Sequence, residues 1–197
     1  MDTAEGQKVT PADDDARLVR AAAAGDAAAM DQLLIRARAI AHRFSLMVCG
    51  RALDTEDVMQ DALLSTFRHA ADIRDPASFR AWLYRTVRNA CLLTRRKRVD
   101  EPAHLLPLDA PGSPDGGAPI DAPSAGRTPE EEADAAERQA MLRQALQRLP
   151  ERQREIIVLR DLEGLSTRDV AAVLQISEDN VKTRLHRGRR ALRAALQ

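Results

Sequence analysis

The stretch from Val99 to Pro129 limits what this chain can fold into more than any other part of the sequence. It contains seven prolines and four glycines, a density that neither a continuous helix nor a central strand tolerates. It also carries many carboxylates and a single arginine, Arg127, so proline and like-charge repulsion both favour extended backbone. We predict a linker over residues 99–134. Whether it lies along a path that nucleic acid would otherwise take, or is simply a solvated spacer, stays open.

The composition of the rest favours small helical domains. Apolar residues make up 44% of the chain, chiefly Ala and Leu, whereas aromatic residues make up only 3%. This balance suits helices with small cores better than β-sheets. We therefore expect an all-α protein with a flexible tail over residues 1–15, a helical domain over 16–98 and a second helical domain over 135–197.

The sequence points away from export, membranes and catalysis. There are only two cysteines, Cys49 and Cys91, which we expect to be buried thiols, and the N-terminus lacks the basic and apolar segments of a leader. No apolar run approaches the length of a membrane-spanning helix, so we expect a cytoplasmic protein without membrane insertion. The pattern of His, Cys and acidic residues matches no metal site, nucleophile or cofactor-binding loop. We expect no catalytic residue, no metal and no cofactor.

Apolar residues recur at spacings of three and four from Met30 to Val48, which predicts a helix with one buried stripe that ends at Gly50. Asp54 and Asp57 have the spacing of a capping box and predict the start of a second helix. Three apolar residues of that helix are spaced for burial, namely Val58, Ala62 and Phe67.

Asp75 and Pro76 predict the start of a third helix over residues 76–98, because an Asp caps the first turn and proline needs no donor there. Its apolar face includes Phe79 and Trp82, and we expect Tyr84 to be the more exposed aromatic residue. From Arg80 to Arg98 there are six arginines, one lysine and no acid. Half of this helix is therefore predicted to be core and the other half cationic.

The C-terminal block predicts a helix-turn-helix. Gly164 is placed to end one helix in a left-handed conformation, Ser166 and Asp169 cap a short helix, and Gln175 with Ile176 forms a turn. Ser177 then caps a basic final helix with no acid from Asn180 onward. Its outward residues have the width and charge to enter the major groove and hold phosphates. The bland alternative is a basic helix that only keeps a bundle in solution.

Three segments resemble the sigma factors of bacterial RNA polymerase. LPERQREIIVLRDLEGLSTRDVAAVLQISEDNVKTRLHRGRRALR resembles sigma region 4, DTEDVMQDALLSTFRHA resembles region 2.2, and DPASFRAWLYRTVRNACLLTRRKR resembles regions 2.3 and 2.4. The linker stands where larger sigma factors have region 3, which indicates the extracytoplasmic-function (ECF) group. Where that family often has an Asp before the arginines, this chain has Leu93.

The resemblance implies a subunit that binds core RNA polymerase and directs initiation at promoters with −10 and −35 elements. It implies −35 contacts from the final helix and its cap: Ser177, Glu178, Asn180, Lys182, Thr183, Arg184, Arg187 and Arg190. It implies −10 contacts and promoter melting by the cationic face and the loop before it: Arg68, His69, Arg80, Tyr84, Arg85, Arg88, Asn89, Arg95 and Arg96. It implies polymerase contacts, on the β′ clamp helices, by Asp54, Asp57, Gln60 and Asp61, with the β flap, promoter DNA and an anti-sigma factor as further partners.

Two other functions stay open on the sequence. A DNA-binding regulator of the LuxR type, which acts without joining polymerase, has a similar helix-turn-helix, but would need a sensor or dimerisation domain in the first block. A module that sequesters a protein partner would show no DNA affinity in residues 139–197.

Overall fold

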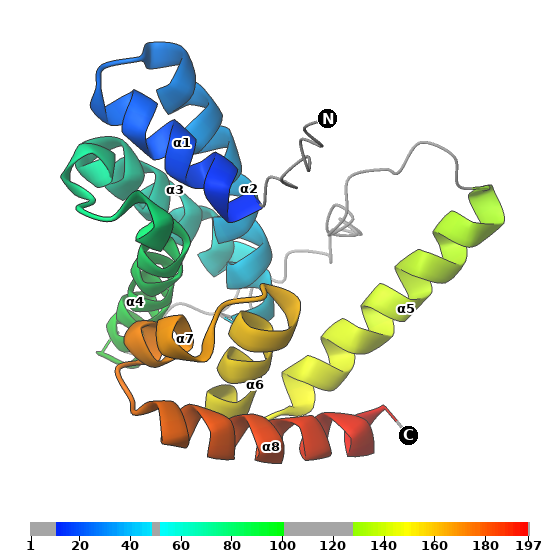
Figure 1. Cartoon of the computed structure of the whole chain (residues 1–197). Coiled ribbons are helices and arrows are strands. Elements are labelled where there is room, and N and C mark those ends of the chain that lie inside the picture. Colours follow the sequence, from blue (N-terminus) through cyan, green and yellow to red (C-terminus); the bar gives the residue numbers. More distant parts are fainter. Residues whose placement is uncertain (1–10, 49–51, 101–127, 197) are drawn as a thin grey trace, which may run out of the picture.

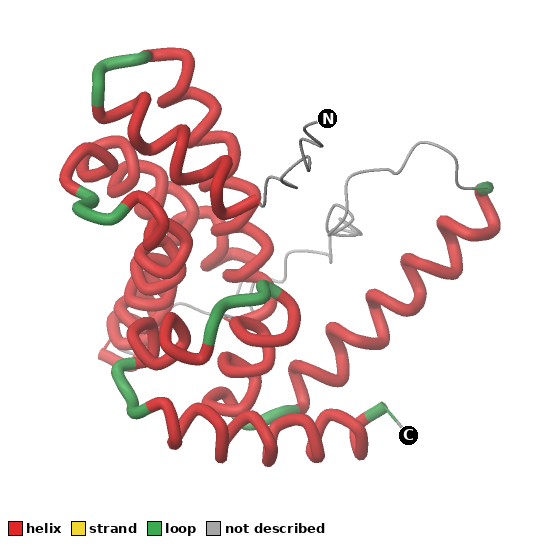
Figure 2. The backbone as a smooth tube through the Cα atoms, in the orientation of Figure 1, coloured by secondary structure: helices red, strands yellow, loops and turns green. Residues whose placement is uncertain are grey.

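The computed structural model describes residues 11–48, 52–100 and 128–196, and these residues form helices without any strand (Figures 1 and 2). The elements follow in the order α1 (Pro11–Ala23), α2 (Ala27–Val48), α3 (Ala52–His69), the 3-10 turns η1 (Ala70–Asp72) and η2 (Pro76–Ser78), α4 (Phe79–Asp100), α5 (Pro129–Arg148), α6 (Glu151–Ile157), the π-helical turn η3 (Val158–Leu162), α7 (Thr167–Leu174) and α8 (Glu178–Ala195). The all-α class predicted from composition is confirmed.

The first domain is a bundle in which α2 packs against α1, α3 and α4. The predicted stripe of α2 is its buried face, where Leu33, Ala37 and Phe44 are fully enclosed. The helix α1 corrects one boundary, because Pro11–Asp15 belong to it and the Asp15 side chain is only 5% exposed. The tail predicted over residues 1–15 therefore overlaps this helix, and residues 1–10 lie outside the described residues, as does Gly50.

Two expectations for α3 were wrong. The helix begins at Ala52, before Asp54, so Asp54 lies within the helix and is not its N-cap. Val58 and Ala62 are buried as expected, but Phe67 is 62% exposed. Phe67 lies five residues beyond Ala62, about 500° around the helix, which places it outside the buried face that Val58 and Ala62 share. The apolar character of Phe67 alone did not show that its side chain is exposed.

The predicted cap at Asp75 is confirmed, although it caps the short turn η2 and not α4 itself. The Asp75 side chain accepts a hydrogen bond from the Ala77 backbone N–H at 3.1 Å, and Pro76 begins the short turn η2 that leads into α4. Phe79, Leu83 and Val87 form the buried face of α4. Tyr84 was expected to be exposed and is instead fully buried, with its ring edge against Phe44 at 5.1 Å between centroids.

The second domain has the predicted helix-turn-helix, formed by α7 and α8. Ser166 and Ser177 cap these helices by accepting hydrogen bonds from the backbone N–H groups of Asp169 and Asn180. Gly164 has φ +70° and ends the preceding segment, while Gln175 has φ 56° and makes the tight turn. Each of these predicted signals is confirmed.

The helix α5 begins within the predicted linker. Thr128 and Glu131 form a capping box, and α5 runs from Pro129, so the end of the segment predicted as linker over 99–134 is helical. At its other end, α4 continues through Asp100. The residues between 101 and 127 lie outside the described residues. The free half of α5 extends away from the rest of the molecule (Figure 1).

The two domains pack against each other. Helix α7 lies against α4, and α5, α6 and η3 lie against α2. Buried apolar residues of both domains join in one cluster, which runs from Leu18 in α1 to Val181 in α8. Gln147 in α5 also donates to the carbonyl oxygens of Leu46 and Met47 at the end of α2, at 3.3 and 3.4 Å. The sequence did not predict this closed arrangement.

The structure also bears on the expectations for the cysteines and for membrane-spanning helices. Cys91 is 3% exposed, as predicted, but it is disulfide-bonded and not a free thiol; Cys49 lies outside the described residues. Among the helices that the structure describes, none combines the length and apolar character needed to cross a bilayer.

Helix α8 crosses α6 closely at Gly188. A Cβ at this position would lie 3.1 Å from Ile157 Cδ1 and 3.3 Å from the Gln153 carbonyl oxygen. We predict that Gly188→Val overpacks this crossing and lowers the free energy of unfolding by about 1–3 kcal/mol. Urea denaturation measures it, with Arg190→Val as a control for the cost of a β-branched residue on the exposed face. Equal losses in the two variants would contradict the packing account.

Candidate nucleic-acid interfaces and the contact between the domains

The outer face of α8 is open to solvent. Val181, Gly188 and the partly buried Leu185 face the domain, while the residues predicted for duplex DNA lie on the outside or flanks. The exposed members are Ser177, Glu178, Lys182, Thr183, Arg187 and Arg190, and the half-buried ones are Asn180 and Arg184. Figure 1 shows α8 running along one edge of the molecule.

Acidic residues modulate the charge of this face. Lys182 Nζ lies 3.0 Å from a carboxylate oxygen of Asp179, one turn earlier, which raises the pKa of Lys182. Arg189 forms a two-point ion pair with Asp161 at the end of η3, which raises the pKa of Arg189. Both pairs are exposed, so they cost little to break when phosphates compete for the cations. The face remains suited to a polyanion.

The second predicted DNA face is divided between exposed residues and residues that are paired with buried acids. Arg68, His69, Arg85 and Asn89 are exposed. Arg95 and Arg96 lie in α4, but the structure does not describe their side chains. The cationic half of α4 therefore has exposed members next to the loop.

The occupied residues are bound by acids. Arg88 Nε donates to Glu155 of α6 at 3.0 Å, and this carboxylate is 5% exposed. Arg80 Nε lies 3.3 Å from a carboxylate oxygen of Asp15, which also binds Arg36 at 2.8 Å. One predicted DNA contact is thus paired with the second domain and another with α1.

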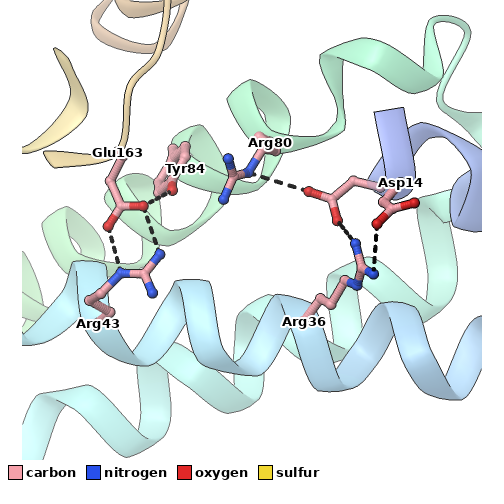
Figure 3. A network of polar contacts seen from close by, with 7 residues as sticks. Asp14, Arg36, Arg43, Arg80, Tyr84 and Glu163 are labelled. Atoms are coloured by element: carbon pink, nitrogen blue, oxygen red, sulfur yellow. Dashed lines mark hydrogen bonds and ion pairs between the residues drawn. The ribbon is translucent and has the colours of Figure 1, made fainter. Parts of the chain in front are cut away.

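The strongest contact between the domains is made by Glu163. Its side chain is 3% exposed and accepts hydrogen bonds from Arg43 Nε at 2.7 Å, Arg43 Nη2 at 2.8 Å and the Tyr84 hydroxyl at 2.5 Å (Figure 3). Arg43 lies in α2 and Tyr84 in α4, while Glu163 follows η3 in the second domain. A single carboxylate therefore receives three donors from the other domain.

The pKa values of the donors reflect this burial. Burial raises the pKa of Tyr84 far above its ordinary value, and the nearby Glu163 carboxylate adds to the effect. The hydrogen bonds to Glu163 raise the pKa of Arg43, against the opposing effect of burial. At neutral pH the hydroxyl thus keeps its proton and the guanidinium its charge, as donation to Glu163 requires.

A cleft separates the loop before α4 from α7. It has a volume of about 560 Å³ and is lined by the loop residues Ile73 and Asp75, by Arg85 of α4, and by Asp169 and Val173 of α7. His69 and Trp82 also border it. The loop predicted for the −10 element therefore faces the second domain of its own chain.

A separate apolar groove lies between α2 and α3. It has a volume of about 370 Å³ and is lined mainly by leucines with Ile35 and Phe67. Ile35 is 69% exposed and Phe67 62%, although both are large apolar side chains. Asp57, Gln60 and Asp61 lie exposed on α3, and Gln60 lines the groove itself. The Asp54 side chain is not among those described.

Sequence reasoning missed Arg43, Glu163 and the groove. The groove could have been found by noting that Ile35 and Phe67 fall outside the buried stripes of their helices. Glu163 sits before the helix-ending Gly164 and gives no local signal, because its partners are 79 and 120 residues away.

Comparisons with known proteins agree on both domains. Residues 30–100 match the family model described as Sigma-70 region 2, and residues 139–192 match Sigma-70, region 4. The chain is 36% identical over 180 residues to the ECF RNA polymerase sigma factor SigM of Mycobacterium tuberculosis, covering 90% of this chain and 82% of SigM.

Two solved structures are also similar. CnrH, in complex with the cytosolic domain of CnrY, has a TM-score of 0.57 and 25% identity, covering 93% of this chain and 97% of that chain. The sigma factor RpoE of Bartonella quintana, in complex with the anti-sigma factor NepR, has a TM-score of 0.61 and 22% identity. This match covers 84% of this chain and 95% of that chain. The second likeness concerns the fold alone.

We predict that Tyr84→Phe lowers the free energy of unfolding by about 1.5–3 kcal/mol, because a hydrogen bond to a buried carboxylate is lost without a change in packing. Urea denaturation at neutral pH measures it. The same substitution in a Glu163→Ala background should cost much less, since the acceptor is gone. An unchanged cost in that background would show that the hydrogen bond is not the cause.

Proposed function

Because this chain belongs to the ECF family of RNA polymerase sigma factors, we propose that its separate faces read −10 and −35 elements and bind core polymerase. The chain is a transcription initiation factor and not an enzyme, and the chemistry of RNA synthesis belongs to the polymerase. The reading as a LuxR-type regulator is not favoured, because region 2 occupies the first block. The single observation that carries the assignment is the presence of both sigma regions in one chain.

The −35 element is assigned to α8. Its outer residues, from Ser177 to Arg190, lie on a helix whose opposite face packs against the domain, which leaves them accessible. A helix of this kind fits the major groove, where its first turns reach base edges and later arginines reach phosphates. Asn180, Lys182, Thr183 and Arg184 would read bases or position the helix, and Arg187 and Arg190 would hold the backbone.

The −10 element is assigned to the cationic face of α4 and the loop before it. Arg68, His69, Arg85 and Asn89 are exposed there, and Arg80, Arg88, Arg95 and Arg96 follow the same helix. Opening a promoter costs a few kcal/mol for each unstacked base, which cations and a pocket must offset. The buried Tyr84 could take part only after the second domain moves away from it.

Core polymerase is assigned to the face formed by α2 and α3. An exposed apolar groove needs a partner to cover it. The acids Asp57 and Asp61 and the polar Gln60 beside it suit a basic helix pair such as the β′ clamp helices. Asp54 belongs to the same helix. We assign the β flap to the second domain by family analogy.

We further propose that an anti-sigma factor regulates this protein in the cytoplasm. RpoE of Bartonella quintana, which shares the fold, is found in complex with the anti-sigma factor NepR. The polymerase-binding groove and the cleft beside α7 are the surfaces that such a partner would compete for.

Reconstitution tests the function. Core polymerase with the purified chain should make specific transcripts from some members of a genomic promoter library, and none without it. Phe67→Asp should weaken polymerase binding about tenfold or more. An exposed aromatic side chain that becomes buried in a complex contributes most to the binding energy of an interface. Met141→Asp, which changes another exposed large apolar residue, on α5, is the matched control. No specific transcript from any promoter would refute the function.

Arg187→Ala tests the α8 assignment. It should weaken duplex binding and reduce the slope of log affinity against log salt by about one, because one phosphate contact is lost. Polymerase affinity should not change. Arg138→Ala on α5 removes the same charge away from α8 and should leave the slope as it is. A wild-type slope for Arg187→Ala would count against this face.

A further inference from the structure

We propose that the described arrangement is a self-inhibited state, in which Glu163 holds the second domain over the −10 face while the −35 face stays open. The proposal rests on the assigned DNA faces and concerns how the chain itself controls access to them. It follows from three features of the contact between the domains.

The first feature is the geometry at Glu163. This nearly enclosed carboxylate accepts three hydrogen bonds at 2.5–2.8 Å, all from Arg43 and Tyr84 of the first domain. Two parallel bonds to a guanidinium fix direction as well as distance. The segment between η3 and α7 is thereby fixed to α2 and α4, and α7 follows it.

The second feature is what this contact covers. Arg88 is paired with the buried Glu155 of α6, and α7 lies against α4 beside the loop. Tyr84 has no exposed surface. The Arg88 side chain keeps 21% of its surface exposed, but a DNA strand could not replace Glu155 at its guanidinium, or reach Tyr84, without displacing α6 or the segment after η3. Glu155 also places a negative charge where a phosphate would bind.

The third feature is the energetic balance of the contact. Removing an ion pair from water costs about as much as the pair returns, so a buried pair adds little net stability but strongly selects one arrangement. When the domains part, water solvates Glu163 and Arg43 again. Such a contact can be both specific and reversible, as a switch between closed and open states requires.

The asymmetry between the two DNA faces makes the proposal testable. The outer residues of α8 are exposed in the closed state, so duplex binding by α8 needs no opening. Arg85 and Asn89 of α4 are exposed as well, but a single strand that also engages Arg88 and Tyr84 does need it. The apparent affinity for single-stranded DNA is then reduced by the fraction of molecules that are open.

The experiment measures binding of the full chain to two fluorescein-labelled probes, a single strand of randomised sequence and a duplex of the same composition. Glu163→Ala should bind the single strand about tenfold more tightly than wild type, because the open fraction rises. Its duplex affinity should stay within about twofold, since α8 is already accessible. Asp161→Ala is the matched control. It removes an equal charge two residues away and breaks an ion pair inside the second domain only.

Two further variants test whether loss of the Glu163 contact causes the increase in affinity for single-stranded DNA. Arg43→Ala breaks the same contact from the first domain and should give a similar gain, which keeps the test valid if Glu163→Ala fails to fold. Adding Arg88→Ala to Glu163→Ala should reduce the gain in single-strand affinity, because Arg88 is one of the two residues that opening uncovers.

Duplex binding with no gain for single strands in either Glu163→Ala or Arg43→Ala would overturn the proposal and leave the proposed function intact. An equal gain in Asp161→Ala would overturn it as well. Absence of duplex binding in every variant, wild type included, would instead overturn the assignment of the DNA faces and, with it, this proposal.

Discussion

The arrangement of this molecule depends on one enclosed carboxylate. Glu163 would be costly to bury alone, and it is tolerated only because Arg43 and Tyr84 supply three donors from the other domain. The apolar cluster shared by the domains provides cohesion, but apolar contact is not directional. The hydrogen bonds at Glu163 decide which surfaces of the two domains meet, and so which functional faces are covered.

The functional surfaces consequently differ in accessibility. The outer face of α8 and the apolar groove of α2 and α3 are open, whereas the proposed −10 face is partly covered, because Arg88 and Tyr84 of α4 meet the second domain. A partner that binds the open groove does not compete with Glu163, so polymerase could engage first and the domains separate afterwards. Promoter opening would then depend on prior assembly, which would prevent the free factor from holding single-stranded DNA.

The sequence was most informative where structure is local. Caps such as Asp75 and Ser177, the left-handed Gly164 and the stripe of α2 depend on neighbours a few residues away, and each was predicted. Predictions failed where burial depends on the other domain or on position around a helix. Tyr84 reads as an exposed aromatic until Glu163 covers it, and Phe67 reads as core until its angle relative to Ala62 is considered. Hydrogen bonds that join residues 120 positions apart leave no periodic pattern to detect.

The measurement that bears most directly on this account is the distance between the domains in solution. Pulsed electron–electron double resonance between spin labels carried by non-natural residues at the exposed positions Gln32 and Arg193 would report it. The account predicts one narrow population for the free chain, and a longer, broader one both for Glu163→Ala and for wild type bound to core polymerase. A single unchanged distribution in all three samples would contradict it.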